Sequence, residues 1–416
     1  MDKLLISGGK KLYGEIRIQG SKNAVLPILA ASVMIEGKLV LDNVPRLVDV
    51  YNMLEILSCL GVRAKFENNS ALIDASNVKN YDVKSALAKE LRSSVFLLGA
   101  ILSRKKEAIV AYPGGCDIGL RPIDIHIKAL KELGVEIEET AGCIKCNGKN
   151  ARAGDLCLDY PSVGATENVM LASVFLKGKT TILNAAREPE IVELQEFLNR
   201  CGAKISGAGT SKITIEGVEK LIPCFYQIGY DRIALGTYAI AVATIGGKIG
   251  IKGVSWVEMN SLLFKLIKNS CNITYENGIM YISADGRNKS VKRISTQPYP
   301  GFATDLQAPF MVMQAVAEGT CVLTENIFEN RFRHVSELRK MGADIIIEDR
   351  TAIIRGVDKL FGTDVYAKDL RGGAGLVVAG LVAEGDTVLN DLYHVDRGYE
   401  NIEKTFAELG AEIKRI

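Results

Sequence analysis

A stretch rich in glycine and proline, residues 112–122, carries the most reactive side chain of the sequence. It reads Tyr-Pro-Gly-Gly-Cys-Asp-Ile-Gly-Leu-Arg-Pro, with Cys116 at its centre and Arg121 near its end. This composition is typical of a loop that bends and closes over a ligand. A cysteine near Lys22 and Arg121 would have a lowered pKa, because cations stabilise the thiolate. The segment therefore indicates a lid with a reactive thiol rather than a small buried side chain.

The starts of six apolar helices carry a second set of polar residues. Free N–H groups and the positive end of the helix dipole attract anions to a helix start. Cations at Lys22, Arg92, Arg121 and Arg371 strengthen that field, so the set suits a multiply charged phosphorylated ligand. The starts are Ser21-Lys22-Asn23, Leu91-Arg92-Ser93, Ser162-Val163-Gly164, Tyr230-Asp231-Arg232, Thr304-Asp305-Leu306 and Asp369-Leu370-Arg371-Gly372.

Serine, threonine and aspartate at these places also have a plain role, because they are common helix N-caps. For Ser93 and Asp231 we favour capping alone. For Lys22 we favour a function, since the positive end of a helix should repel a cation.

These helices belong to a unit that occurs six times. Each copy ends in a helix, a small-residue turn and a strand, and the turns are 68–73 residues apart. A unit of this length cannot bury its own apolar faces, so the copies must pack on one another. The turn residues are Gly61, Gly134, Gly202, Cys271, Gly342 and Gly410.

Each copy predicts a strand, an apolar helix, a short strand, an amphipathic helix and two antiparallel strands. In the first copy these are GEIRIQG, a helix from Asn23 to about Ile35, KLVLDN, a helix from Leu47 to Leu60, VRAKFE and ALIDA. The first helix is apolar on every side and should be buried. The second has a charged face and should contact solvent.

The six copies predict an α/β protein of two domains with three copies each. The sixth copy stops at Ile416 without a final strand, and LLISGG and GEIRIQG at the N-terminus can supply the missing pairing. We therefore expect one domain of residues 21–229, which carries the Cys116 loop. The other comprises residues 1–20 and 230–416, with Asp305, Arg371 and Arg397.

The composition is that of an ordinary soluble globular protein, with 48% hydrophobic and 24% charged residues. A net charge of +2 gives no reason to expect nucleic acid as a partner, and no apolar stretch approaches the ~20 residues of a membrane helix. The first nine residues do not read as a signal peptide, and nine irregularly spaced cysteines favour a reducing cytoplasm. Cys143 and Cys146 lack the further ligands of a zinc site, so we expect no metal.

Eight segments resemble the family of UDP-N-acetylglucosamine 1-carboxyvinyltransferases, which are enolpyruvyl transferases of the EPSP synthase superfamily. The similarity covers essentially the whole chain, and the Cys116 loop and Asn184-Ala-Ala-Arg-Glu-Pro-Glu190 are specific to that family. The other segments are Gly20-Ser-Lys-Asn-Ala, Ser162-Val-Gly-Ala-Thr166, Thr304-Asp305-Leu-Gln307, Phe328-Glu-Asn-Arg331-Phe, Asp369-Leu-Arg371 and His394-Val-Asp-Arg397-Gly-Tyr399.

The resemblance implies the inside-out α/β barrel: two domains, each of three βαβαββ units around buried parallel helices, with the active site between them. It implies transfer of the enolpyruvyl group of phosphoenolpyruvate to the 3′-hydroxyl of UDP-N-acetylglucosamine, with release of phosphate. The reaction proceeds by addition to a tetrahedral ketal and then by elimination, and it needs no metal or organic cofactor. It is the first committed step of peptidoglycan precursor synthesis in the cytoplasm, which links it to cell shape and division, and it is the target of fosfomycin.

The resemblance also implies roles for single residues. Asp305 is the base toward the sugar hydroxyl, and Cys116 is the acid toward C3 of phosphoenolpyruvate or a nucleophile. Lys22, Arg121 and Arg397 neutralise the phosphate and carboxylate, and Arg331 and Arg371 add to the same cluster. The nucleotide lies along Arg121, Pro122, Asp124 and the helix start at Ser162. The remaining substrate-binding residues are Asn23, Arg92, Ile123, Ile125, Val163, Gly164, Ile327 and Glu329.

The sequence departs from the family at Tyr160, where members have lysine beside the diphosphate-binding helix start. Tyr299 and Ala303 likewise replace histidine and proline before Asp305. Two alternatives are 5-enolpyruvylshikimate-3-phosphate synthase, which lacks the Pro-Gly-Gly-Cys loop, and a non-catalytic UDP-sugar-binding paralogue, which would not need Cys116 and Asp305. A nucleotide kinase is disfavoured, because Ser173 stands where a P-loop needs glycine.

Overall fold

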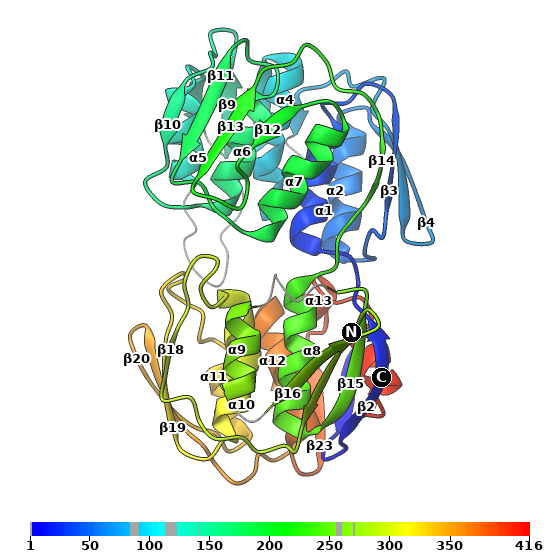
Figure 1. Cartoon of the computed structure of the whole chain (residues 1–416), viewed down its shortest axis with the longest axis vertical. Helices are drawn as coiled ribbons and strands as arrows, with labels where there is room; N and C mark the ends of the chain where they lie inside the picture. The colour runs from blue at the N-terminus through cyan, green and yellow to red at the C-terminus, as the bar shows by residue number, and fades with distance from the viewer. Residues whose placement is uncertain (1, 84–90, 113–122, 141, 255–259, 269–270) are drawn as a thin grey trace. The chain divides into compact units, whose positions relative to one another are not determined.

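The structure, a computed structural model, describes all residues except 1, 84–90, 113–122, 141, 255–259 and 269–270. The described residues divide into two compact units (Figure 1). The C-terminal unit contains those of Met1–Gln19 and Tyr230–Ile416, and the N-terminal unit contains those between Gly20 and Gly229.

The described strands form six sheets of four strands, three in each unit. In the third repeat, β10 (Asp155–Cys157) runs parallel to β11 (Lys179–Leu183), which pairs antiparallel with β13 (Lys212–Glu216). The edge strand β12 (Lys204–Ser206) closes the hairpin. The same order occurs in β6 (Asp82–Val83), β7 (Glu107–Ala111), β9 (Cys143–Asn147) and β8 (Glu136–Thr140), and in β18 (Arg293–Ser295), β19 (Thr320–Thr324), β21 (Thr351–Arg355) and β20 (Asp344–Glu348).

The N-terminal strands complete two sheets of the C-terminal unit. β1 (Leu4–Ser7) pairs antiparallel with β23 (Asp386–Asn390) and β24 (Glu412–Arg415), which confirms the pairing expected of LLISGG. β2 (Leu12–Arg17) instead runs parallel to β15 (Gly247–Lys252), the central strand of the fourth repeat. The remaining strands of these two sheets are β22 (Asp364–Tyr366), β16 (Asn272–Glu276) and β17 (Ile279–Ala284).

The first repeat differs from the sequence prediction. Its sheet does not contain GEIRIQG; β14 (Phe225–Gln227) lies there instead, parallel to β3 (Lys38–Asp42). The reason is connectivity, since the chain leaves the C-terminal unit after Gln19 and returns to it at Tyr230. β2 therefore stays with the unit it begins in. The hairpin of this sheet consists of β5 (Ser70–Asp74) and β4 (Arg63–Glu67).

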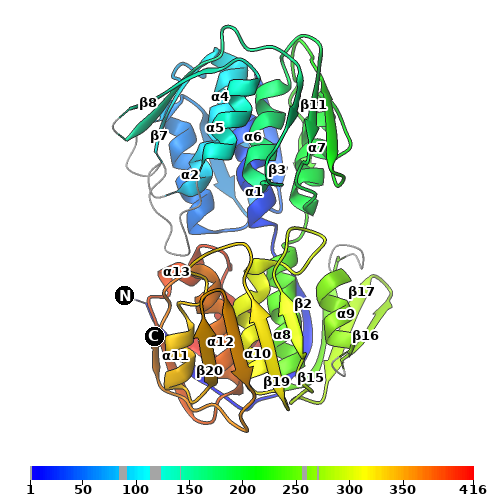
Figure 2. The same cartoon turned by 90° about the vertical axis from the view of Figure 1, so that its left-hand side faces the viewer.

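Apolar helices form the centre of each unit, as their all-round apolar pattern predicts. Every residue of α8 (Arg232–Ile245) from Ile233 onward is buried. Figure 2 shows α8 beside α10 (Gln307–Ala315) and α12 (Leu370–Val382), with strands outside them. Gly375 lets α12 approach α10, because a Cβ at this position would lie 3.1 Å from the backbone of Ala308. The corresponding helices of the N-terminal unit are α1 (Lys22–Ser32), α4 (Leu97–Lys105) and α6 (Val163–Ser173).

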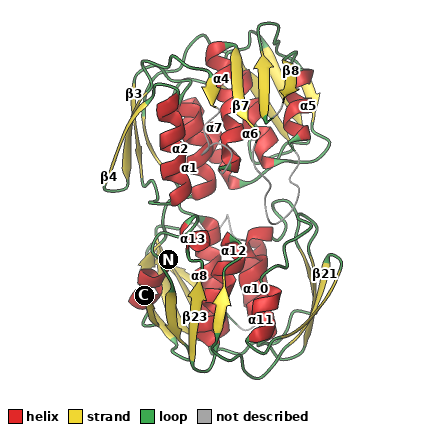
Figure 3. Ribbon diagram, turned by 180° about the vertical axis from the view of Figure 1, so that it is seen from behind, coloured by secondary structure: helices red, strands yellow, loops and turns green. Residues whose placement is uncertain are grey.

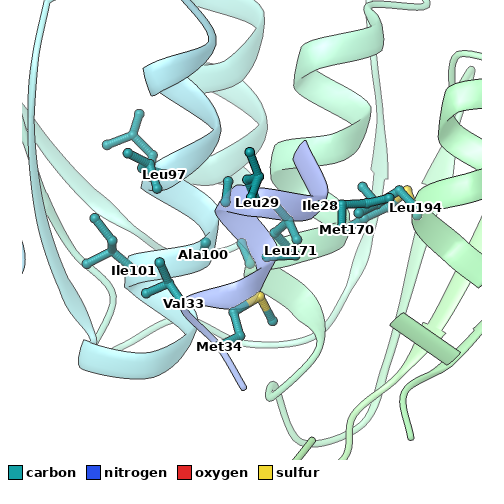
Figure 4. Packing of buried hydrophobic residues seen from close by; sticks show 14 of the residues in the cluster. Ile28, Leu29, Val33, Met34, Leu97, Ala100, Ile101, Met170, Leu171 and Leu194 are labelled. Atoms are coloured by element: carbon teal, nitrogen blue, oxygen red, sulfur yellow. The ribbon is translucent and has the colours of Figure 1, made fainter. Parts of the chain in front are cut away.

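The core of the N-terminal unit is packed from these three helices. Ile28 and Leu29 of α1, Leu97 of α4, Met170 of α6 and Leu194 of α7 (Pro189–Arg200) all belong to this core, with α1 between α4 and α7 (Figure 4). All five side chains are fully buried. Burying a side chain of this size stabilises the fold by about 1.5–3 kcal/mol, so the helices are held in place chiefly by apolar contact.

Amphipathic helices cover the outside, as predicted. In α7 the side chains of Ile191, Leu194, Phe197 and Leu198 are buried while Glu196 is exposed. Figure 3 shows the strands flanking the helices within each unit. None of the helices in the described part of the chain combines the length and apolar character needed to cross a bilayer. The other outer helices are α2 (Val48–Cys59), α5 (Asp124–Glu132), α9 (Asn260–Lys268), α11 (Val335–Lys340) and α14 (Ile402–Glu408), and α13 (Tyr393–Asp396) is a short additional one.

Candidate active site

In the C-terminal unit, the structure brings together three residues that the sequence singles out. Asp305 lies in a 3₁₀ turn, Thr304–Leu306, that leads into α10. Its carboxylate Oδ1 lies 2.8 Å from Nη2 of Arg331, and its Oδ2 lies 3.0 Å from Nη2 of Arg371. The arginine side chains are only 3% and 4% exposed, whereas the Asp305 side chain is 25% exposed. The carboxylate is thus the accessible member of a buried cationic cluster.

Arg371 is oriented by residues of two other elements. Its guanidinium carbon lies 5.5 Å from the ring centroid of Tyr399, and the Tyr399 hydroxyl is 2.8 Å from that of Thr237 on α8. Burial is the largest single effect and lowers the pKa of Arg371, but Asp305, Tyr399 and Asp231 together outweigh it, so the net pKa is raised. The guanidinium therefore keeps its charge and is suited to hold a carboxylate or phosphate.

In the N-terminal unit, Lys22 begins α1 and has a buried acidic partner. Its Nζ lies 2.6 Å from Oδ2 of Asp49 on α2, and the two side chains are 10% and 4% exposed. The hydroxyl of Ser21 caps the helix by accepting from the N–H of Ala24 at 3.3 Å. Asp49 explains how a cation is tolerated at a helix start, because its charge offsets the repulsion from the dipole. Sequence reasoning missed Asp49, since no local pattern links it to Lys22.

The start of α6 is built around a histidine of fixed tautomer. Asn168 is oriented by the backbone, because its Oδ1 accepts from the N–H of Gly99 (2.7 Å) and its Nδ2 donates to the carbonyl of Val95 (2.9 Å). Nδ2 also lies 3.0 Å from Nδ1 of His126. Nδ1 must accept, so the imidazole proton sits on Nε2.

That Nε2–H group lies beside the first turn of α6. A Cβ at Gly164 would be 3.1 Å from Nε2 of His126, so only glycine leaves this space open. Ser162 caps the helix by accepting from the N–H of Ala165 at 3.3 Å. Nε2 of His126 therefore lies beside the first turn of α6, and a helix start of this kind favours an anion.

Two predicted nucleotide-binding residues line a hollow of the N-terminal unit. Ile123 and Asp124, at the start of α5, border a cavity of about 640 Å³ that Tyr112 and Lys128 also line. This volume lies in the range of small-molecule sites. Ile123 is buried, Asp124 is exposed and Ile125 is half-buried, so the residues offer one apolar and one charged contact.

The comparisons with known proteins agree on one family. A protein of Caldanaerobacter subterraneus subsp. tengcongensis named UDP-N-acetylglucosamine 1-carboxyvinyltransferase 2 is 50% identical over 416 residues and covers all of both chains. One of Trichlorobacter lovleyi, named UDP-N-acetylglucosamine 1-carboxyvinyltransferase, is 47% identical over 417 residues, which are 100% of this chain and 99% of the other. The chain belongs to the UDP-N-acetylglucosamine 1-carboxyvinyltransferase family.

The broader relations of this family are seen in two further comparisons. The family model described as EPSP synthase (3-phosphoshikimate 1-carboxyvinyltransferase) matches residues 6–406. The enolpyruvyl transferase NikO from Streptomyces tendae has the same fold, with a TM-score of 0.89 at 23% identity over 100% of this chain and 98% of that one. An EPSP synthase from Acinetobacter baumannii has a TM-score of 0.75 at 20% identity over all of both chains. The fold is the two-domain α/β fold of enolpyruvyl transferases.

The other predicted site residues of this family member are spread over both units. Ile327 and Glu329 lie in the segment between β19 and α11, where Glu329 pairs with Arg350 at 2.9 Å. Arg397 is the C-cap residue of α13 and is partly buried. Asn23 is in the first turn of α1, Arg92 begins the 3₁₀ turn Arg92–Phe96, and Val163 is the first residue of α6. Cys116, Arg121 and Pro122 lie outside the described residues.

Of the two residues assigned to capping, one is confirmed and the other is wrong. Asp231 caps α8, because its Oδ1 accepts from the N–H groups of Ile233 (2.8 Å) and Ala234 (2.9 Å). Ser93 lies inside the turn Arg92–Phe96, whose N-cap is Leu91. The reason is that the second repeat begins this helix with a 3₁₀ turn, which moves the cap position before Ser93.

Within the described residues, no cluster of three or more His, Cys, Asp or Glu side chains could hold a metal ion. Cys143 and Cys146 lie three residues apart on β9, so their side chains point to opposite faces of the strand. Burial raises the pKa of the Cys146 thiol to about 12. The two cysteines are therefore placed as strand residues and not as a chelating pair.

A buried histidine adjoins the arginine cluster. His334 is 1% exposed and packs against the start of α12. A Cβ added at Gly372 would lie 3.0 Å from the Cβ of His334. Burial lowers the pKa of His334 to about 4, Asp369 opposes this shift, and Arg331 adds to it. The imidazole is therefore neutral at neutral pH.

This lowered pKa predicts a loss of stability in mild acid. An unfolded histidine has a pKa of about 6.5, so below that pH the unfolded chain binds a proton that the folded chain excludes until about pH 4. Between pH 7 and pH 5 we expect His334 to cost about 1–2 kcal/mol of stability. Urea unfolding at both pH values should show a shallower pH dependence for His334→Gln. Equal pH dependence of the variant and the wild type would contradict the assignment.

Proposed function

We propose that this enzyme transfers the enolpyruvyl group of phosphoenolpyruvate to the 3′-hydroxyl of UDP-N-acetylglucosamine and releases phosphate. The full-length relatives that carry this name, at 50% and 47% identity, are the observation that carries the proposal. The accessible carboxylate of Asp305, held by two buried guanidiniums, supports it, because the reaction needs a base beside groups that bind anions.

We propose that Asp305 takes the proton of the sugar hydroxyl while the hydroxyl oxygen attacks C2 of phosphoenolpyruvate. C3 gains a proton, for which Cys116 is the proposed acid, and a tetrahedral ketal forms. The Cys116 thiolate then takes a proton back from C3, the C2–O bond to phosphate breaks, and the double bond is restored. Negative charge stays on the phosphate and carboxylate throughout, and Lys22, Arg121 and Arg397 are the proposed cations that hold it.

Arg331 and Arg371 have a second part in this scheme. Both guanidiniums neutralise Asp305 in the structure, at 2.8 and 3.0 Å. An arriving carboxylate or phosphate would compete for the same N–H groups and leave Asp305 a stronger base. Binding of the donor would thereby activate the carboxylate that starts the reaction.

The proposed nucleotide site lies in the N-terminal unit. The helix start at Ser162, Val163 and Gly164 would bind diphosphate, with the Nε2–H of His126 beside it. Tyr160 is 41% exposed and brings no cation, so these donors and the backbone would carry more of the diphosphate contact than in members with lysine. Asn23, Arg92, Arg121, Pro122, Ile123, Asp124, Ile125, Asp305, Ile327, Glu329, Arg331, Arg371 and Arg397 complete the proposed substrate-binding set.

We further propose the setting of the reaction. The domains would be residues 21–229 and residues 1–20 with 230–416. The product would be the first committed precursor of peptidoglycan, made in the cytoplasm, so loss of the enzyme would affect cell wall synthesis, cell shape and division.

Phosphate release from phosphoenolpyruvate tests the activity. UDP-N-acetylglucosamine should support phosphate release and shikimate-3-phosphate should not. If no phosphate were released with either acceptor, a non-catalytic UDP-sugar-binding protein would be favoured.

Cys116 should be the fastest of the nine cysteines to be alkylated, and fosfomycin should modify it. Nearby cations would stabilise its thiolate and attract an anionic electrophile, whereas burial raises the pKa of Cys271 to about 11 and that of Cys321 to about 12. Mass spectrometry of the treated protein locates the adduct. Cys116→Asp should escape fosfomycin and keep part of the turnover, and an adduct on another cysteine would refute the assignment.

A further inference from the structure

A buried carboxylate holds the residue that precedes the proposed base. Glu325 follows β19 and is 1% exposed. Its Oε1 accepts hydrogen bonds from the hydroxyl of Thr296 (2.8 Å) and from the N–H groups of Ile327 (2.9 Å) and Phe328 (3.2 Å). Its Oε2 accepts one from the hydroxyl of Thr304 at 3.0 Å. Four hydrogen bonds thus converge on the two oxygens of one buried side chain, which ties Thr304 to residues 296, 327 and 328.

The sheet explains why these groups meet. β18 and β19 are parallel neighbours, and Ser295 pairs with Thr324 at their carboxyl ends. Thr296 and Glu325 are the next residue of each strand, so they leave the sheet at the same edge. The two segments that follow these strands both contact the carboxylate of Glu325. Thr304 does so after Thr296, and Ile327 does so after Glu325 itself.

Thr304 is held at a second point by the same segment. Nη2 of Arg331 lies 3.3 Å from the carbonyl oxygen of Thr304 and 2.8 Å from Oδ1 of Asp305. Residues 325–331 thus hold the hydroxyl and the carbonyl of Thr304 at once. A shift of Thr304 would move Asp305 relative to Arg331.

We infer that Glu325 and Thr304 are positioning residues that keep Asp305 in place for attack by the sugar hydroxyl. This inference rests on the proposed function. Glu325 acts through Thr304 on the turn that carries Asp305, and through Ile327 and Phe328 on the loop that carries Arg331. A misplacement of about 1 Å can lower a rate by about 10²-fold, so a hydrogen bond one residue from the base has a large effect on turnover.

Three variants separate positioning from stability. Thr304→Val keeps the shape of the side chain and loses the hydroxyl, and Thr304→Ser keeps the hydroxyl. Thr296→Val is the control, because it removes the other hydroxyl that donates to Glu325 without touching the turn of Asp305. We expect Thr304→Val to lower kcat about 10–100-fold, with the KM for UDP-N-acetylglucosamine changed by less than about threefold. Thr304→Ser should keep kcat within about threefold, and Thr296→Val should lower the melting temperature more than kcat.

A fourth variant tests the direction of the effect. Ala303 has φ −65° and ψ 128°, which is a conformation that proline adopts. Ala303→Pro should therefore stiffen the turn and recover about threefold or more of the kcat lost in Thr304→Val. Equal losses of kcat in Thr304→Val and Thr296→Val, or wild-type kcat in Thr304→Val, would overturn the inference.

Amide hydrogen exchange gives a readout that needs no turnover. Thr304→Val should speed exchange at residues 304–306, and Thr296→Val should speed it at residues 326–328. If the wild type released no phosphate with UDP-N-acetylglucosamine, the proposed function would fail, and the exchange pattern would still decide the structural link. Unchanged exchange at residues 304–306 in Thr304→Val would refute that link in either case.

Discussion

Replacing Asp305 by alanine is expected to lower kcat by about 10²–10⁴-fold, the usual cost of removing a general base. The change also leaves Arg331 and Arg371 buried without their shared carboxylate, and breaking a buried ion pair costs about 3–5 kcal/mol of stability. Asp305→Asn is therefore the better variant, because it keeps the shape and two polar atoms while losing the basic oxygen.

Single-turnover kinetics with calorimetric titration of each ligand separates chemistry from binding. Asp305→Asn should lower the single-turnover rate by at least about 10²-fold. Its affinity for UDP-N-acetylglucosamine should fall by roughly tenfold at most, since the amide can still form a hydrogen bond. Normal turnover at saturating sugar nucleotide would make Asp305 a binding residue, and another group would have to accept the proton.

Replacing Lys22 by methionine is expected to have two separate effects. The first is structural, because Asp49 is 4% exposed and would lose a partner at 2.6 Å. Breaking a buried ion pair by removing one member costs about 3–5 kcal/mol of stability. The second is functional, because Lys22 is a proposed cation of the phosphoenolpyruvate site and its loss would remove a charged hydrogen bond worth about 1.5–3 kcal/mol.

The double variant Lys22→Met with Asp49→Asn separates these effects. Removing the second charge should restore most of the stability measured by chemical denaturation. The KM for phosphoenolpyruvate should stay raised by about 10–100-fold in both variants, as the lost hydrogen bond implies. If Asp49→Asn restored phosphoenolpyruvate handling as well, Lys22 would be a structural residue only.

The repeat explains how much of the fold could be predicted from the sequence. Periodic apolar residues predicted the buried helices, and the turn glycines mark backbone that other residues rarely adopt. Gly61, Gly134, Gly202, Gly342 and Gly410 all have φ between 85° and 100°. Pairing across the chain was harder, because a strand motif does not say which sheet it joins. GEIRIQG could thus be recognised as a strand, while its partner β15 could not be identified.

The candidate site was predictable as a set of residue types and not as a set of contacts. Asp305, Arg331 and Arg371 were recognised by family motifs, and their mutual ion pairs come from packing of distant elements. Asp49 and Glu325 carried no signal, since a single acidic residue in an ordinary segment reads as a surface charge. Their role depends on burial, which the local pattern does not reveal.

The pairing of β1 with β24 has a consequence for the order in which the protein can fold as it is synthesised. Residues 20–229 form a continuous segment, so the ribosome releases all strands of the N-terminal unit before the rest is made. The C-terminal unit begins with Leu4–Ser7, but the strand that flanks it, Glu412–Arg415, is the last to emerge. The first strand must therefore wait for nearly the whole chain, and contacts of such long sequence separation form slowly. The N-terminal unit is thus inserted in the chain of the C-terminal unit, and it can fold before the C-terminal unit is complete.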